Sequence, residues 1–167
     1  AMPGVPYTPC CDAQGNVTED ALRKAAEAAK DHKIAIVVAG LPDAYESEAL
    51  DREHMGLPEG HNRMIEAVAA ANPNTIVVLL GGSAMELPWA DKVKAILYMG
   101  LPGQAGGQAA ANLLTGKANP CGKLTETWPV SYCDVISRDT FGKRNVEYRE
   151  GVYVGYRYYD KAKKAVR

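Results

Sequence analysis

The sequence lacks a strong excess of charge of either sign. Its 19 lysines and arginines stand against 20 aspartates and glutamates, which leaves a formal net charge of -1. Such a chain has no general electrostatic attraction to nucleic acid or to an anionic membrane. Long apolar runs are also missing, because segments such as residues 34–40 and 75–80 fall far short of the roughly 20 residues that a membrane helix needs. The sequence therefore predicts neither a nucleic-acid partner nor a membrane partner.

Motifs for metal binding and for a disulfide framework are missing too. The histidines do not form an H-E-x-x-H motif or a comparable ligand spacing, so we expect no metal and no cofactor. The cysteines include no C-x-x-C pair, and we expect reduced thiols. No basic, apolar leader opens the chain, which predicts a cytoplasmic protein, with secretion left open because the native N-terminus is expected to be missing. The cysteines are Cys10, Cys11, Cys121 and Cys133.

Apolar and amphipathic segments alternate along the first two thirds of the chain. Residues 34–39 form a continuous apolar run rich in β-branched side chains, which is typical of a parallel strand buried on both faces. Two further strands are predicted over 75–80 and 94–99, and helices over 61–71 and 104–114. This order predicts an α/β fold, namely a three-layer αβα sandwich with a mainly parallel sheet, flavodoxin-like in appearance and truncated.

The remaining elements have weaker signals. A helix is predicted from Thr18, a good N-cap residue, to about Lys30, and its mostly alanine inner face is expected to lie against the sheet. A short edge strand is predicted within residues 1–15. Two more strands are predicted at 123–129 and 151–156, and the polar stretch between these two is predicted to be a loop.

Three connections are expected to meet at one edge of the sheet. Right-handed crossovers bring the carboxyl ends of parallel strands to the same side. That side would gather residues 40–59, residues 81–83 and the glycine-rich turn at 100–107. Open α/β sheets bind their ligands along this edge, so the edge is the predicted site.

The first of these connections is acidic. Residues 43–53 hold five carboxylates, and a carboxyl group placed at a ligand-binding edge is suited to general acid/base catalysis. The alternative is a solvated acidic loop without chemistry, which is the common fate of a charge run. The carboxylates belong to Asp43, Glu46, Glu48, Asp51 and Glu53.

Other residues at this edge support weaker alternatives. The turn at 100–107 precedes a helix, where phosphate could bind, but it matches neither nucleotide-binding glycine motif, so a tight turn is favoured. Ser83 could be a nucleophile, yet it lacks the G-x-S-x-G elbow. Trp89 and Trp128 could stack on a sugar, although packing is favoured for both. Packing is also favoured for the tyrosines at 148, 153, 156, 158 and 159.

A series of short motifs carries a family resemblance. In their order along the chain they resemble the C-terminal α/β sandwich domain of glycoside hydrolase family 3, the β-glucosidase family, from about Val5 to Lys161. Each motif alone is weak, whereas the ordered set is specific. The motifs are residues 46–52, Gly56-Leu57-Pro58, residues 69–75, 82–89, 102–107, 119–125 and 154–160.

The resemblance implies a retaining β-glycosidase, of the β-glucosidase type, that hydrolyses terminal β-linked sugars of a glucoside or oligosaccharide. In that family an N-terminal barrel supplies the aspartate nucleophile, and a fibronectin-like domain often follows. Both are absent here, so residues 1–167 are predicted to be a partial C-terminal domain. This chain alone is predicted to be inactive and to self-associate through surface that the missing parts would cover.

The resemblance also implies the site residues. Many members carry the general acid/base glutamate in an E-G-[YF]-D-R pattern, which aligns with Glu48; Ala49-Leu50 replaces the glycine and the aromatic residue here. Glu46 is the second candidate. Asp51 and Arg52 are expected to frame the loop as a structural ion pair. Two other classes stay open, a non-catalytic carbohydrate-binding or interaction module and a flavodoxin-like nucleotide- or phosphate-binding module.

Overall fold

The described part of the chain, residue 2 and residues 4–167 of a computed structural model, divides into two compact units. The first unit combines residues up to 52 with residues 57–83 and 88–121. The second combines residues 53–56, 84–87 and 122–167. The sheet and most of the helices lie in the first unit.

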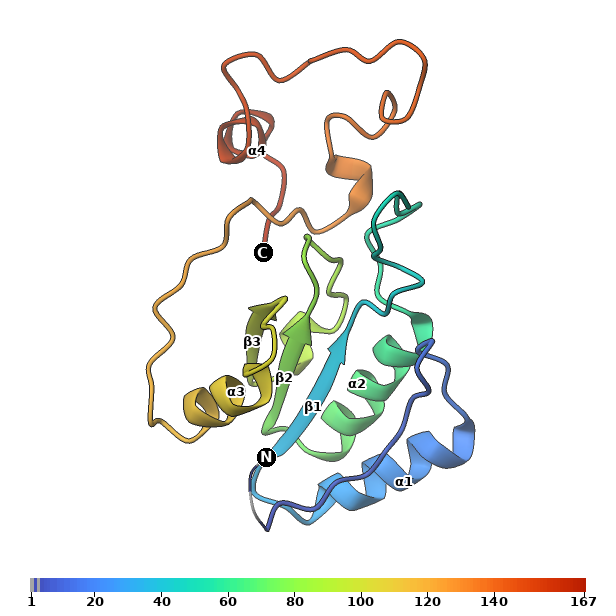
Figure 1. Cartoon of the computed structure of the whole chain (residues 1–167), viewed down its shortest axis with the longest axis vertical. Helices are drawn as coiled ribbons and strands as arrows, with labels where there is room; N and C mark the ends of the chain where they lie inside the picture. The colour runs from blue at the N-terminus through green and yellow to red at the C-terminus, as the bar shows by residue number, and fades with distance from the viewer. Residues whose placement is uncertain (1, 3) are drawn as a thin grey trace. The chain divides into compact units, whose positions relative to one another are not determined.

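The sheet of the first unit is parallel. Its strands are β1 (Ala35–Gly40), β2 (Thr75–Leu80) and β3 (Ala95–Gly100), in the order β1-β2-β3 (Figure 1). Val37 lies opposite Val77, and Val77 opposite Ile96, and the register between β2 and β3 shifts by one residue between Leu79 and Leu80. The predicted α/β class, a truncated sandwich on a parallel sheet, is confirmed.

Two helices form layers beside the sheet. Helix α2 (Glu59–Ala71) packs against β1 and β2, and α1 (Glu19–Lys30) packs against α2, as Figure 1 shows. The predicted N-cap of α1 is confirmed, because the hydroxyl of Thr18 accepts a hydrogen bond from the backbone N–H of Ala21 at 3.2 Å. The prediction that the alanine face of α1 lies against the sheet was wrong, since that face packs on α2.

The core of the first unit lies between the sheet and α2. Ile65 of α2 and Val77 and Leu79 of β2 are fully buried there. Alternate residues of a strand point to opposite faces, so Val37 and Ala39 of β1 point toward this core and are buried.

The other face of β1 is open, which corrects the prediction of a strand buried on both faces. Val38 is 58% exposed, and Ile34, just before the strand, is 55% exposed. The physical reason is that α1 forms an outer layer on α2 and leaves this face uncovered. A continuous apolar run indicates that both faces of a strand can be buried. It does not show which helix, if any, covers each face.

The glycine-rich turn leads from β3 into α3 (Gly106–Leu114). A β-carbon at Gly106 would lie 2.6 Å from Cγ of Pro102, so only glycine lets the chain fold back closely here. This supports the tight-turn interpretation of residues 100–107. Ahead of β3, a short 3-10 helix, η1 (Ala90–Lys92), follows the fully buried Trp89.

The second unit consists mainly of loops. It contains the 3-10 helix η2 (Tyr132–Asp134) and the helix α4 (Tyr156–Ala162). The loop predicted over residues 131–149 is confirmed apart from η2. The strands predicted at 123–129 and 151–156 were wrong. Pro129 makes one isolated bridge, to Val166, and residues 151–155 are irregular with turns at 151, 152 and 155.

The tyrosines of the second unit depart from the packing prediction. Tyr148 is 93% exposed, and Tyr153 and Tyr156 are also exposed. Tyr158 and Tyr159 are half-buried, with ring centroids 5.1 Å apart in an edge-to-face contact. The second unit consists mainly of loops, so it has too little apolar core to bury all of these tyrosine rings.

The N-terminal segment forms no strand within the described residues 2 and 4–15, contrary to the prediction of an edge strand. Cys11 makes an isolated bridge to Val17. The four cysteines are free thiols. Over the described residues, every helix is too short or too polar to cross a membrane.

Candidate functional site

The carboxyl ends of the strands meet at one edge of the sheet, as predicted. The N–H of Leu41 donates to the carbonyl oxygen of Leu80 at 3.0 Å, and the N–H of Gly81 donates to that of Gly100 at 3.1 Å. The hydroxyl of Tyr98 donates to the carbonyl oxygen of Gly81 at 2.6 Å. These bonds tie the ends of the three strands together.

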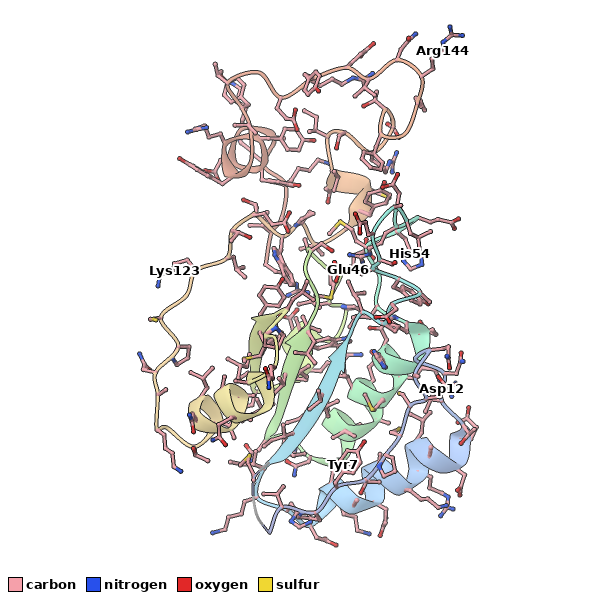
Figure 2. All side chains as sticks on the ribbon, viewed as in Figure 1. Tyr7, Asp12, Glu46, His54, Lys123 and Arg144 are labelled. Carbon is pink, nitrogen blue, oxygen red and sulfur yellow. The ribbon has the colours of Figure 1, made fainter. Side chains whose placement is uncertain are left out.

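Glu46 is bound into this edge. Figure 2 shows it at the carboxyl ends of the strands. Its Oε2 accepts the N–H of Gly82 at 2.7 Å, and its Oε1 accepts the hydroxyl of Ser83 at 2.8 Å. A β-carbon at Gly82 would stand 3.2 Å from Glu46 Oε1, so the glycine allows the carboxylate to approach the backbone closely.

Arg52 completes the same cluster from the other side of the loop. Its Nη1 donates to Oγ of Ser83 at 2.8 Å. The Ser83 hydroxyl therefore accepts from a guanidinium while it donates to a carboxylate, and hydrogen bonds to charged groups are the strong ones. We call the four residues Glu46, Arg52, Gly82 and Ser83 the Ser83 anchor.

Between the two flanks of the anchor, residues 47–50 form a turn. Ser47 and Leu50 make an isolated bridge, and the N–H of Leu50 donates to the carbonyl oxygen of Ser47 at 3.3 Å. Ala49 has φ +62°, a left-handed conformation that favours glycine. The chain keeps the backbone conformation of a glycine although alanine stands there. We call residues 47–50 the Glu48 turn.

Glu48 is exposed at the second position of this turn. Within the described residues its carboxylate accepts no hydrogen bond and forms no ion pair. Asp43 and Asp51 are exposed as well, and Glu53 belongs to the second unit. Among the described residues Asp51 forms no ion pair with Arg52, so Arg52 frames the loop through Ser83 instead.

Sequence reasoning placed Ser83 at this edge but missed its role. The hydroxyl proton is committed to Glu46, and the oxygen accepts from Arg52. Its position shortly after the central strand, which ends at Leu80, was the available signal. Residue spacing could not show which loop Ser83 holds, because Ser83 and Glu46 lie 37 positions apart in the sequence.

The base of the acidic loop is closed by His61. Its Nδ1 lies 2.9 Å from the carbonyl oxygen of Gly40. Burial lowers the pKa of the His61 imidazole below its usual 6.5, against the opposing effects of the hydrogen bond to Gly40 and of the Asp12 charge. The neutral ring is therefore the form that fits this position.

Both tryptophans pack inside the protein, as predicted. Trp89 is 0% exposed and its Nε1–H donates to Oδ1 of Asn62 at 2.9 Å, while Trp128, in the second unit, is 4% exposed. Neither ring face is open for a sugar. Over the described residues, no group of three or more metal-ligating side chains occurs.

The fold and the edge define the chain as an α/β domain that presents an anchored acidic loop where parallel sheets bind ligands. The family model described as "Glycosyl hydrolase family 3 C-terminal domain" matches residues 5–156. The chain is 51% identical over 150 residues to thermostable beta-glucosidase B of Acetivibrio thermocellus, a match that covers 86% of this chain and 19% of that protein.

A second curated relative and a solved structure are also similar to this chain. Identity to exo-alpha-(1->6)-L-arabinopyranosidase of Bifidobacterium breve is 42% over 146 residues, covering 86% of this chain and 19% of that protein. The beta-glucosidase structure from Kluyveromyces marxianus in complex with glucose superposes with a TM-score of 0.84 at 37% identity, over 89% of this chain and 18% of that one.

This chain belongs to the glycosyl hydrolase family 3 C-terminal domain family. The resemblance in the ordered motifs is thereby confirmed. The chain spans 19% of the length of each of the two curated relatives, so it corresponds to a fragment of them.

Proposed function

We propose that this chain is the C-terminal domain of a retaining β-glycosidase of the β-glucosidase type, and that Glu48 is its general acid/base. One observation carries the assignment: the Glu48 carboxylate is exposed and without a partner among the described residues, on a turn whose two flanks are bonded to the carboxyl edge of the sheet. A proton-transfer group must reach its substrate and must also be held in place.

The chemistry requires a second carboxylate from outside this chain. In a retaining glycosidase the nucleophile and the acid/base lie about 5–5.5 Å apart on the two sides of the scissile bond. The protonated Glu48 gives its proton to the glycosidic oxygen while the nucleophile bonds to the anomeric carbon and the alcohol departs. The Glu48 carboxylate then takes a proton from water, and that water displaces the enzyme carboxylate to release the sugar.

Glu46, the second candidate, has a different role in this proposal. Both of its oxygens accept hydrogen bonds at the sheet edge. Proton delivery would require breaking these bonds, which makes Glu46 a positioning residue.

The proposed substrate is a terminal β-linked glucoside or oligosaccharide, in line with the beta-glucosidase names of the relatives. One relative at 42% identity is instead named an arabinopyranosidase. Similar domains thus occur with different sugars, which supports placing sugar recognition in the other parts of the longer protein.

We also propose two properties of the isolated chain. It is inactive, because the barrel domain that would carry the nucleophile is its functional partner and is absent. It self-associates through β1, an edge strand with an exposed apolar face around Ile34 and Val38, and open edges of this kind pair readily. A cytoplasmic location stays a prediction.

A chimera tests the catalytic assignment. This chain would replace the matching 150-residue segment of the Acetivibrio thermocellus beta-glucosidase B. Glu48→Ala should lower kcat/KM by about 10²- to 10⁴-fold for aryl β-glucosides with poor leaving groups. Activated aryl glucosides should lose little, because their leaving groups depart without protonation. Azide should raise kcat of the variant for activated substrates.

Two controls accompany this test. Asp43→Ala removes a carboxylate of the same loop that has no chemical role in the proposal, and it should leave both substrate classes nearly unchanged. The isolated chain should hydrolyse neither class. The proposal is wrong if Glu46→Ala produces the leaving-group pattern and Glu48→Ala does not.

A further inference from the structure

The geometry points to Ser83 as the residue that positions Glu48, because its hydroxyl is bonded to both flanks of the Glu48 turn. This inference rests on the proposed function of Glu48 and adds to it a residue far away in the sequence. Ser83 touches no reacting atom in this scheme; it acts through Glu46 and Arg52.

The hydrogen bonds around Ser83 form a continuous path across the base of the turn. Oγ of Ser83 donates to Glu46 Oε1 at 2.8 Å and accepts from Arg52 Nη1 at 2.8 Å. Beside it, the N–H of Gly82 donates to Glu46 Oε2 at 2.7 Å. One flank of the turn is thus bonded to Ser83 and Gly82, and the other flank is bonded to Ser83.

The strand before Ser83 is the most constrained part of the sheet. β2 is the central strand and pairs with β1 and β3. Val77 and Leu79 in this strand are fully buried. A side chain that follows such a strand after a short turn has little freedom of its own, so bonds to Ser83 fix the turn relative to the sheet.

The turn itself is short enough for its two flanks to determine its geometry. Glu48 lies two residues after Glu46 and four before Arg52, and the Leu50-to-Ser47 hydrogen bond closes the turn. The Glu48 carboxylate makes no bond of its own within the described residues. Its place is therefore set by the backbone of the turn, and a displacement of about 1 Å at a catalytic group can cost about 100-fold in rate.

Removal of the hydroxyl should displace the turn and leave the fold intact. In Ser83→Ala, Glu46 and Arg52 lose the atom that separates and orients them. As opposite charges they can pair directly, which would draw the two flanks into a new arrangement. Ser83→Thr keeps the hydroxyl and is the matched conservative variant.

The experiment compares Ser83→Ala and Ser83→Thr in the chimera described above. For aryl β-glucosides with poor leaving groups, Ser83→Ala should lower kcat/KM by about 10- to 100-fold. For activated substrates the loss should stay below about threefold, because they need little acid assistance. Ser83→Thr should return both values to within about threefold of the unsubstituted chimera. A loss in Ser83→Ala that is equal for both substrate classes overturns the positioning role, since a merely structural residue would act in that way.

Glu48→Ala in the same chimera separates the two claims. If Glu48→Ala shows the leaving-group pattern and Ser83→Ala does not, the inference on Ser83 fails alone. If Glu48→Ala lacks the pattern, the proposed function fails, and the assignment to Ser83 fails with it.

Hydrogen exchange on the isolated chain keeps the inference testable if the Ser83→Ala chimera does not fold. The Leu50 amide, whose hydrogen bond to Ser47 closes the Glu48 turn, should exchange at least about tenfold faster in Ser83→Ala than in the unsubstituted chain. Amides of Val77 and Val78 should be unchanged, and Ser83→Thr should behave as the unsubstituted chain does. Unchanged exchange in the turn of Ser83→Ala would overturn the inference.

Discussion

The Nδ1 atom of His61, in the first turn of α2, lies 2.9 Å from the carbonyl oxygen of Gly40, the last residue of β1. The two residues flank the connection that contains the Glu48 turn. The neutral tautomer with its proton on Nδ1 can donate to this oxygen, and the charge of Asp12 acts on the ring in favour of protonation. The base of the connection is thereby held by an imidazole whose pKa burial lowers below its usual 6.5.

This contact predicts a loss of stability in mild acid. Burial lowers the pKa of His61 in the folded chain below its usual 6.5, so the unfolded chain binds a proton more readily than the folded one. The stabilisation is fully present above pH 6.5 and declines as the pH falls below that value toward the folded pKa. Urea unfolding of the isolated chain at a series of pH values measures the effect.

Two variants provide the comparison for the His61 titration. His61→Asn keeps a side-chain N–H near Gly40 and should flatten the pH dependence of the free energy of unfolding below pH 6.5. His32, an exposed histidine, is the control, and His32→Asn should leave the dependence as it is. An unchanged pH profile in His61→Asn would contradict the account of this contact.

Ala49→Gly should stabilise the isolated chain. Ala49 has φ +62°, where a β-carbon is disfavoured, and relief of this strain should raise the free energy of unfolding by about 0.5–1 kcal/mol. The same change at Ala28, an exposed residue inside α1, should lower it by about 1 kcal/mol. Denaturant unfolding of both variants measures the sign of each change in the free energy of unfolding. Destabilisation by Ala49→Gly would show that the left-handed turn is not present in solution.

Tryptophan fluorescence should not respond to sugars in the isolated chain. Trp89 is fully buried with its Nε1–H bonded to Asn62, and Trp128 is buried with 4% of its surface exposed. Titration with glucose or cellobiose should leave the emission unchanged, whereas urea should shift it to longer wavelength as the chain unfolds. Saturable quenching by either sugar would support a carbohydrate-binding module in place of the catalytic proposal.

Val38→Lys should reduce self-association of the isolated chain. Val38 is 58% exposed on β1, so a lysine there costs little in stability and places a charge where a second copy would pair. Light scattering should show a lower average mass for this variant. Leu101→Lys, at a 76% exposed position after β3, should leave the average mass unchanged. A monomeric unsubstituted chain would rule out the proposed association.

Local patterns predicted the sheet and its helices well, because each depends on neighbouring residues. The predicted strand at 75–80 coincides with β2, and α1 begins after Thr18 as its side chain suggested. The tyrosine-rich run at 151–156 was wrongly predicted as a strand. Gly151 and Gly155 adopt φ +54° and +62°, which breaks an extended chain into turns.

The candidate site was predictable at the level of the edge but not of its bonds. Crossover handedness brought the acidic loop and residues 81–83 together. It could not show that Ser83 is bonded to Glu46, since this contact joins residues that are 37 positions apart. It also could not show that Arg52 would pair with the serine in place of its neighbour Asp51. Such contacts depend on side-chain geometry at the end of a strand, which no local pattern encodes.

The product that Glu48→Ala forms with azide tests the central claim most directly. In the chimera, an activated aryl β-glucoside would form the glycosyl-enzyme, and azide would attack it from the side where Glu48 normally activates water. The account predicts β-glucosyl azide, with retained configuration, identified by proton NMR of the product. α-Glucosyl azide would mean that Glu48 is the nucleophile, and the absence of any glycosyl azide, together with unchanged hydrolysis, would mean that Glu48 takes no part in the reaction.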